Sequence, residues 1–277
     1  PDTVPASTGG TFVGQVTFTA DTTFSSGVSI ASTLNVDSTI NGVGIISNIS
    51  NFSEGILISD DASTGTLNTA NYNTGLGARV FEDLTSGDEN TAMGRVALAN
   101  LTTGSNNVAI GNDSLFTNTT GGNNTSLGKN ALQANTTASN NTAVGSGALS
   151  ANTTAGRCTA VGDSCLDANT TGADNTAVGQ GSLGANTTGN NNVAMGYQAL
   201  RSNVAGDKSV AIGVQALDAQ NPSGNADMLN TAVGHAAGTS VTTGIQNTIL
   251  GALAGDALTV GSTNVALGVS ALGADTQ

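Results

Sequence analysis

The chain has 277 residues, of which 19 are acidic and six are basic, and its formal net charge is −13. Nucleic acids and anionic membrane surfaces are recognised through clustered Lys and Arg, so this charge balance argues against both as partners. The sequence contains no run of about 20 apolar residues, and we therefore expect no membrane insertion.

The first 46 residues divide into two segments by their sequence pattern. Residues 1–10 look like an irregular leader, and residues 11–46 follow a six-residue period with paired inward side chains two positions apart. The pairs are Val16 and Phe18, Thr22 and Phe24, Val28 and Ile30, and Leu34 and Val36. Side chains two apart share one face of a strand, so this hexad pattern predicts a triangular β-helix. One coiling chain and three interleaved chains both satisfy the pattern.

Residues 47–72 follow neither the hexad period nor the longer period that comes after them. Ile56, Leu57 and Ile58 form an apolar run that we expect to be buried. We interpret this segment as an adaptor that covers the end of the following stack.

From residue 73 to residue 277 the chain repeats one 17-residue unit. The copy Asn175–Asn191 reads NTAVGQGSLGANTTGNN, and its residues define positions 1 to 17 of the repeat. A glycine at position 5 marks each of twelve copies, and one longer step, from Gly213 to Gly234, interrupts the spacing. These glycines are Gly77, Gly94, Gly111, Gly128, Gly145, Gly162, Gly179, Gly196, Gly213, Gly234, Gly251 and Gly268. A unit this short cannot fold alone, so the copies must stack and share one core.

The repeat positions predict which side chains form that core. Position 4 is always Val, Ile, Leu or Met, and position 9 is Leu in nine copies, so we expect these two columns to be the core. Positions 3 and 8 are nearly all Ala or Ser, small enough for two backbones to approach closely. The invariant Gly at position 5 suits a corner with positive φ or a contact that a Cβ would block.

Asparagine occupies position 1 in ten of the twelve copies and position 12 from Asn118 to Asn203. Identical amides one layer apart can form hydrogen-bonded ladders along a stack. The T-A-V and A-L segments, set between Gly and N-T-T-G corners, predict short strands and turns and no helix. We therefore predict an all-β fold, a β-solenoid with one coil per repeat over residues 73–277.

A coil with two large core side chains is thin, and the small residues at positions 3 and 8 offer a second packing face. We therefore predict a homotrimer in which three chains pack around one axis. With a rise of about 4.8 Å per coil, twelve coils would span roughly 50 to 60 Å.

The repeat segments N-T-A-V-G and S-V-A-I-G, for example Ser209–Gly213, resemble repeats in the heads of trimeric autotransporter adhesins. The resemblance implies a trimeric β-roll, although the 17-residue period is longer than the adhesin repeat and implies a larger coil. The hexad segment followed by such repeats resembles tail fibres of bacteriophages, especially those that infect cyanobacteria. No coiled-coil stalk, membrane anchor or C-terminal chaperone domain occurs in this sequence, which fits a mature fibre or a fragment better than a whole autotransporter.

Cys158 and Cys165 fall in one coil, at positions 1 and 8, and are the chain's two cysteines. Two interpretations remain open, a local disulfide and a pair of small buried thiols. We predict no cofactor and no metal site. Asp60, Asp61 and the Asn columns are nevertheless oxygen donors that an ion on the axis of a trimeric fibre could use.

The candidate receptor contacts are Phe116, Tyr197, Asn221, Pro222 and Asn225. Phe116 and Tyr197 stand where other coils carry polar residues, and the other three belong to Asn221–Met228, which fills the four-residue insertion and must bulge from its coil. Aromatic side chains and a projecting loop can stack on sugars. Neutral drift would produce the same pattern.

The sequence as a whole favours a structural protein of a phage virion, a tail fibre or similar appendage that acts as a rigid trimeric spacer in host attachment. The expected partners are further copies of the chain, other virion proteins and a host surface glycan. The alternative is the head of a bacterial surface adhesin, located on the cell surface. We expect that the protein is not an enzyme, because its Asp residues are scattered and do not form the carboxylate cluster that a glycan-cleaving solenoid needs.

Overall fold

The computed structural model of the chain describes residues 44–49, 52–59 and 67–273. All of them belong to one compact unit, Ser38–Gln277. These residues form strands and turns and no helix, so the predicted all-β class is confirmed. The predictions for the leader, for Asp60 and Asp61 and for the hexad segment lie outside the described residues, apart from residues 44–46. The predicted domain boundaries stay predictions.

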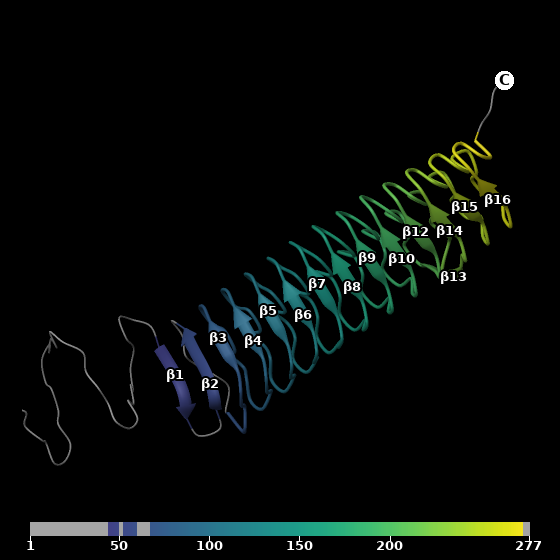
Figure 1. Cartoon of the computed structure of the whole chain (residues 1–277). Helices are drawn as coiled ribbons and strands as arrows, with labels where there is room; N and C mark the ends of the chain where they lie inside the picture. Colours follow the sequence, from purple (N-terminus) through teal and green to yellow (C-terminus); the bar gives the residue numbers. More distant parts are fainter. Residues whose placement is uncertain (1–43, 50–51, 60–66, 274–277) are drawn as a thin grey trace, which may run out of the picture. The chain divides into compact units, whose positions relative to one another are not determined.

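A parallel sheet runs through this unit and makes it a β-solenoid (Figure 1). Its repeating strands are three-residue segments that recur once in every 17-residue repeat, except at the longer step. They are β3 (Thr74–Leu76), β4 (Thr91–Met93), β5 (Val108–Ile110), β6 (Thr125–Leu127), β7 (Thr142–Val144), β8 (Thr159–Val161), β9 (Thr176–Val178), β10 (Val193–Met195), β12 (Val210–Ile212), β14 (Thr231–Val233), β15 (Thr248–Leu250) and β16 (Val265–Leu267). Each strand pairs in register with the next, as Ala143 does with Ala160. The predicted 17-residue coil is therefore confirmed.

An antiparallel hairpin precedes the first coil. Its strands are β1 (Gly44–Ile49) and β2 (Phe52–Ser59), and β2 pairs in parallel with β3, with Leu57 opposite Gly75. Leu57 is fully buried, and its Cδ1 lies 2.7 Å from the place that a Cβ on Gly75 would occupy. Glycine at position 3 of the first coil therefore makes room for the side chain that the hairpin inserts.

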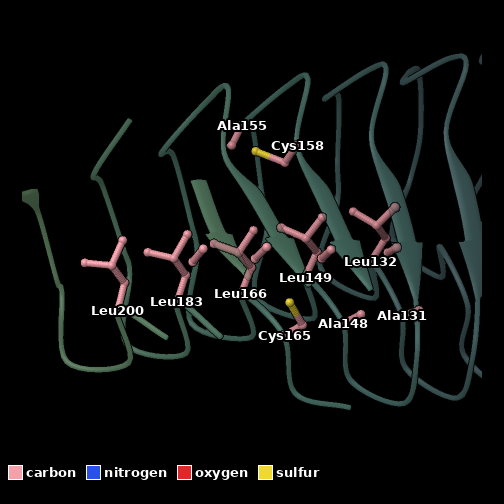
Figure 2. Packing of buried hydrophobic residues seen from close by; sticks show 14 of the residues in the cluster. Ala131, Leu132, Ala148, Leu149, Ala155, Cys158, Cys165, Leu166, Leu183 and Leu200 are labelled. Carbon is pink, nitrogen blue, oxygen red and sulfur yellow. The ribbon is translucent and has the colours of Figure 1, made fainter. Parts of the chain in front are cut away.

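The interior differs from the predicted core, which consisted of positions 4 and 9. Position 3, predicted as a close-approach position, is buried, as in Ala143 and Ala160, and so are the alanines of position 8 and the leucines of position 9 in every coil except the last, where Leu272 is 50% exposed. Leu132, Leu149, Leu166, Leu183 and Leu200 form one continuous stack (Figure 2). Position 4 points outward, and Leu127 in that column remains 45% exposed. The prediction that position 4 belongs to the core was wrong.

The alternation of a β-strand explains this error. Residues 1 and 3 share one face of each short strand, and residues 2 and 4 share the other. Asparagine at position 1 and alanine at position 3 are buried, so the face that carries them is the inner face of the strand. Because the leucine of position 9 occupies the space opposite, the strand side of the coil admits only small side chains.

The A-L segment is a turn and not the predicted strand. The residues at positions 7, 9 and 17 have positive φ in successive coils, for example Ser164 at 51°, Leu166 at 51° and Asp174 at 59°. Leucine rarely adopts this conformation. The hydrogen bond from Leu149 N to Cys165 O at 3.0 Å, repeated from coil to coil, holds it there.

The predicted asparagine ladders are present and buried. Asn107 Nδ2 donates to Asn90 Oδ1 at 3.0 Å and to Gly121 O at 2.9 Å, and Asn107 Oδ1 accepts Asn124 N at 3.0 Å. In the position-12 ladder, Asn135 Nδ2 donates to Asn118 Oδ1 at 2.9 Å. Fully satisfied polar columns inside a narrow core fix the layers in one register.

One coil departs from both ladders at once. It carries Ser209 at position 1 and Gln220 at position 12, and both are fully buried. Gln220 Nε2 donates to Asn203 Oδ1 at 3.2 Å, and Gln220 Oε1 accepts Asn230 Nδ2 at 2.9 Å. The longer glutamine amide therefore joins the two ladders where the shorter serine leaves a gap.

Candidate functional site

The outward side of the parallel sheet carries a column of apolar side chains. We call this side the outer sheet face and define it by positions 2 and 4 of the repeating strands. Its position-4 column is aliphatic or Met in every coil and half-buried to exposed. The exposed members of that column are Leu76, Met93, Leu127, Met195, Ile212, Leu250 and Leu267. Position 2 adds Thr or Val beside it. Contiguous apolar surface of this kind marks an interaction site in soluble proteins.

The two aromatic candidate contacts do not come together in the structure. Phe116 lies at position 10 and is half-buried, whereas Tyr197 lies at position 6 and is 45% exposed. Five coils separate them, roughly 24 Å at the usual strand spacing. They form no common site, although Tyr197 remains available to a ligand.

The insertion candidates form a defined structure that folds back on the stack. Strand β13 (Ala226–Asp227) pairs in parallel with β11 (Gly206–Asp207) of the preceding coil. Asn221, Ser223 and Asn225 are exposed, and Pro222 is half-buried. The sequence pattern locates this loop but gives no sign of the second small sheet that anchors it.

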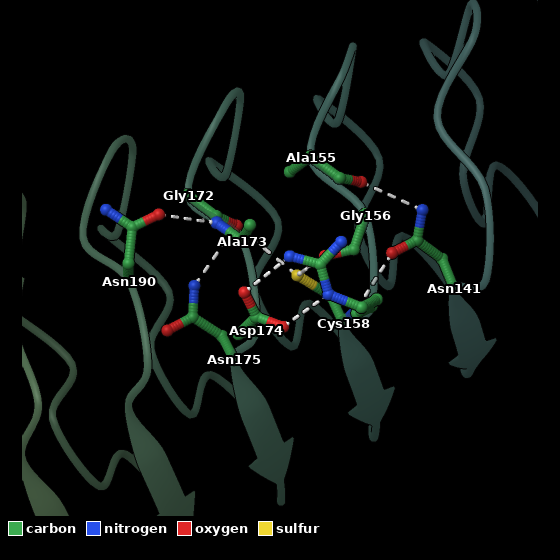
Figure 3. A network of polar contacts seen from close by, with 10 residues as sticks. Asn141, Ala155, Gly156, Cys158, Gly172, Ala173, Asp174, Asn175 and Asn190 are labelled. Atoms are coloured by element: carbon green, nitrogen blue, oxygen red, sulfur yellow. Dashed lines mark hydrogen bonds and ion pairs between the residues drawn. The ribbon is translucent and has the colours of Figure 1, made fainter.

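Both cysteines are free and buried, so the interpretation as two small buried thiols describes the pair. They lie on opposite sides of the leucine stack (Figure 2). Cys158 takes the place of an asparagine in the position-1 ladder, where its N donates to Asn141 Oδ1 at 2.9 Å and its Sγ lies 3.3 Å from Gly172 O (Figure 3). The thiol thus replaces the amide donor.

Burial raises the pKa of the Cys158 thiol, and it raises the pKa of Cys165 to about 12. Because the thiolate is the reactive form, we expect neither residue to react with iodoacetamide in the folded protein at pH 8. Intact-mass measurement should show two added groups only after unfolding in guanidinium. Rapid labelling of the native protein, or a mass two hydrogens lower than the sequence requires, would contradict this.

The two partly buried acidic groups lie far apart in the part of the chain that is described. Burial raises the pKa of Asp167 and of Asp218, but both occupy position 10 and lie three coils apart. Among the described residues no group of three or more His, Cys, Asp or Glu side chains is placed to hold a metal ion. Residues 44–49, 52–59 and 67–273 likewise include no helix able to cross a membrane.

Comparisons with protein-family models, curated proteins and solved structures gave no match for this chain. Its fold class therefore rests on the repeat and on the coil geometry described above.

Proposed function

We propose that the chain is a structural virion fibre protein, a phage tail fibre or comparable appendage that acts as a rigid trimeric spacer in host attachment. The observation that supports this proposal best is the uninterrupted stack from β3 to β16, in which every layer is hydrogen-bonded to the next. Buried asparagine ladders run inside the stack and resist sliding and bending of the layers. Repetition of one coil gives length and stiffness, which are the properties a spacer requires.

The outer sheet face supports self-association. Positions 3 and 8, which the sequence suggested as the packing surface between chains, are buried within one chain in every coil before the last and cannot form that surface. Position 4 offers an aliphatic stripe of twelve strands, roughly 50 Å long. We assign the contact between copies to this stripe. The number of copies, three, is the prediction made from the sequence, and the resemblance to adhesin heads implies the same number.

A triple substitution tests the contact between copies. We expect the protein to have the mass of a trimer in light scattering, and Ile110→Lys with Leu127→Lys and Val144→Lys to yield monomers, because lysine ammonium groups would be desolvated at the interface. The matched control places three lysines on the exposed corners, at Thr120, Thr137 and Thr154. The control should remain trimeric. A monomeric parent protein, or a face variant that stays trimeric, would refute the interface.

The virion assignment is tested by location. Mass spectrometry of purified phage particles should detect the chain, and labelled particles should show it on a projecting appendage. The alternative function, the head of a bacterial trimeric surface adhesin, places the chain in the surface fraction of uninfected cells instead. The exposed apolar stripe suits both, so location decides between them.

A further inference from the structure

The longer coil differs from the others at its corner. Its nine residues Asn221–Leu229 replace the five residues that other coils have at positions 13–17. Both ends of the segment keep their backbone hydrogen bonds to the next coil. Asn221 N donates to Thr242 O at 3.0 Å, and Gln246 N donates to Met228 O at 2.7 Å. The extra residues therefore do not interrupt the hydrogen bonding between coils.

Three contacts hold the inserted segment against earlier coils. Lys208 Nζ pairs with Asp227 Oδ2 at 2.7 Å, and Met228 N donates to Asp207 O at 3.0 Å. Thr188 Oγ1 donates to Asn225 Oδ1 at 2.8 Å and belongs to the coil two layers back. The loop is consequently preformed, which lowers the entropy that binding would cost.

The preceding coil is adapted to this loop. It carries Val204 and Ala205 where the coil before it has the N-T-T-G threonines, and Ala205 is only 8% exposed. Pro222 Cδ and Met228 Cγ lie 3.2 Å and 2.9 Å from the place that a Cβ on Gly206 would occupy. A small satellite core therefore lies under the loop.

The exposed residues of these two consecutive corners combine aliphatic and uncharged polar groups. Val204 is 36% exposed and Leu229 is 44% exposed, and Asn221, Ser223 and Asn225 are also exposed. We call these five residues the insertion platform. Other described coils carry polar residues at the repeat positions of Val204 and Leu229, as at Thr119 and Asn123.

We propose that the insertion platform is a binding site for an uncharged oligosaccharide, which is the host-surface contact if the chain serves in attachment as proposed above. Amides and a hydroxyl bind sugar hydroxyls, while Val204 and Leu229 cover the apolar faces of sugar rings. The nearby cation, Lys208, is neutralised by Asp227, and the chain carries a net charge of −13, so an anionic glycan is disfavoured. A platform built by one loop is small for a protein partner, which typically covers about 800 Å².

Two variants test the platform on an array of neutral and acidic bacterial surface oligosaccharides. The corner-swap variant replaces Asn221–Leu229 with the five residues Thr119–Asn123. The reversion variant, Val204→Thr with Leu229→Asn, restores residues common in other coils and leaves the loop in place. We expect the parent protein to bind neutral glycans and both variants to lose at least about tenfold in affinity, since two aliphatic contacts are worth about 1.5 kcal/mol or more.

The matched control is Thr119→Ala with Asn123→Ala, at the same two repeat positions on an ordinary corner, which should bind as the parent does. Thermal melting and light scattering should be unchanged in the reversion variant, which separates lost binding from lost folding. Three results would contradict the proposed site. They are a parent protein that binds no neutral glycan, a parent protein that binds acidic glycans only, and unchanged binding by both variants. If the chain is found in virions while these glycans are not bound, the fibre role stands and the glycan site fails.

Discussion

Replacing Asn107 with aspartate should destabilise the protein by about 3 to 5 kcal/mol at pH 7. Asn107 is fully buried and donates both amide hydrogens, to Asn90 Oδ1 and to Gly121 O. Aspartate has the same shape but would set a carboxylate oxygen against these two acceptor oxygens. Urea denaturation followed by circular dichroism measures the loss.

The same variant should recover stability at low pH. Burial and the two facing acceptor oxygens would raise the pKa of the new carboxyl in the folded state above its unfolded value of about 3.9. The folded state would then bind a proton more tightly than the unfolded state, so stability falls as pH rises from about 4 towards the folded pKa. The difference from the parent protein should therefore shrink at pH 3 to 4.

The neighbouring residue supplies the control. Asn106 is exposed at position 17, with φ of 61°, and Asp174 occupies the same position in another coil. Asn106→Asp should change stability by no more than about 0.5 kcal/mol. Equal effects at Asn106 and Asn107, or a loss at Asn107 that does not depend on pH, would mean that the ladder does not carry the layer contacts.

Replacing Gly145 with alanine should also cost about 3 kcal/mol or more. Gly145 has φ of +137°, and a Cβ built on it would lie 2.3 Å from Gly162 O in the next coil. The neighbouring backbone cannot give way easily, because Gly162 N donates to Val144 O at 2.8 Å. A large drop in the urea midpoint is the expected result.

Gly147, two residues further on, is the matched control. Its φ is +67°, and the nearest atom to an added Cβ is Ser164 Oγ at 3.8 Å. Asn130 occupies the same position one coil earlier with φ of 59°, so Gly147→Asn should fold with a change within about 1 kcal/mol. If both glycine variants are equally tolerated, the tight contact at position 5 is not a constraint on the stack.

Much of the fold follows from the repeat alone. Twelve copies of a 17-residue unit leave stacking as the way to share a core, and the asparagine columns become ladders because equivalent atoms then lie one strand spacing apart. The invariant glycine is predictable for the same reason, since no other residue has both a positive φ of this size and no Cβ. The candidate loop is located by the single longer step between Gly213 and Gly234.

The tertiary structure alone decided which face of each strand is inside. Alternation groups positions 1 with 3 and 2 with 4, but alanine fits a narrow interior and valine fits either face, so the sequence leaves the choice open. Closure of the coil around the position-9 leucines, held at positive φ by bonds between layers, leaves space only for alanine. That closure turns the position-4 column outward. The structure alone likewise showed that the insertion is anchored by a strand pairing with the preceding coil, because the repeat has no counterpart of that pairing.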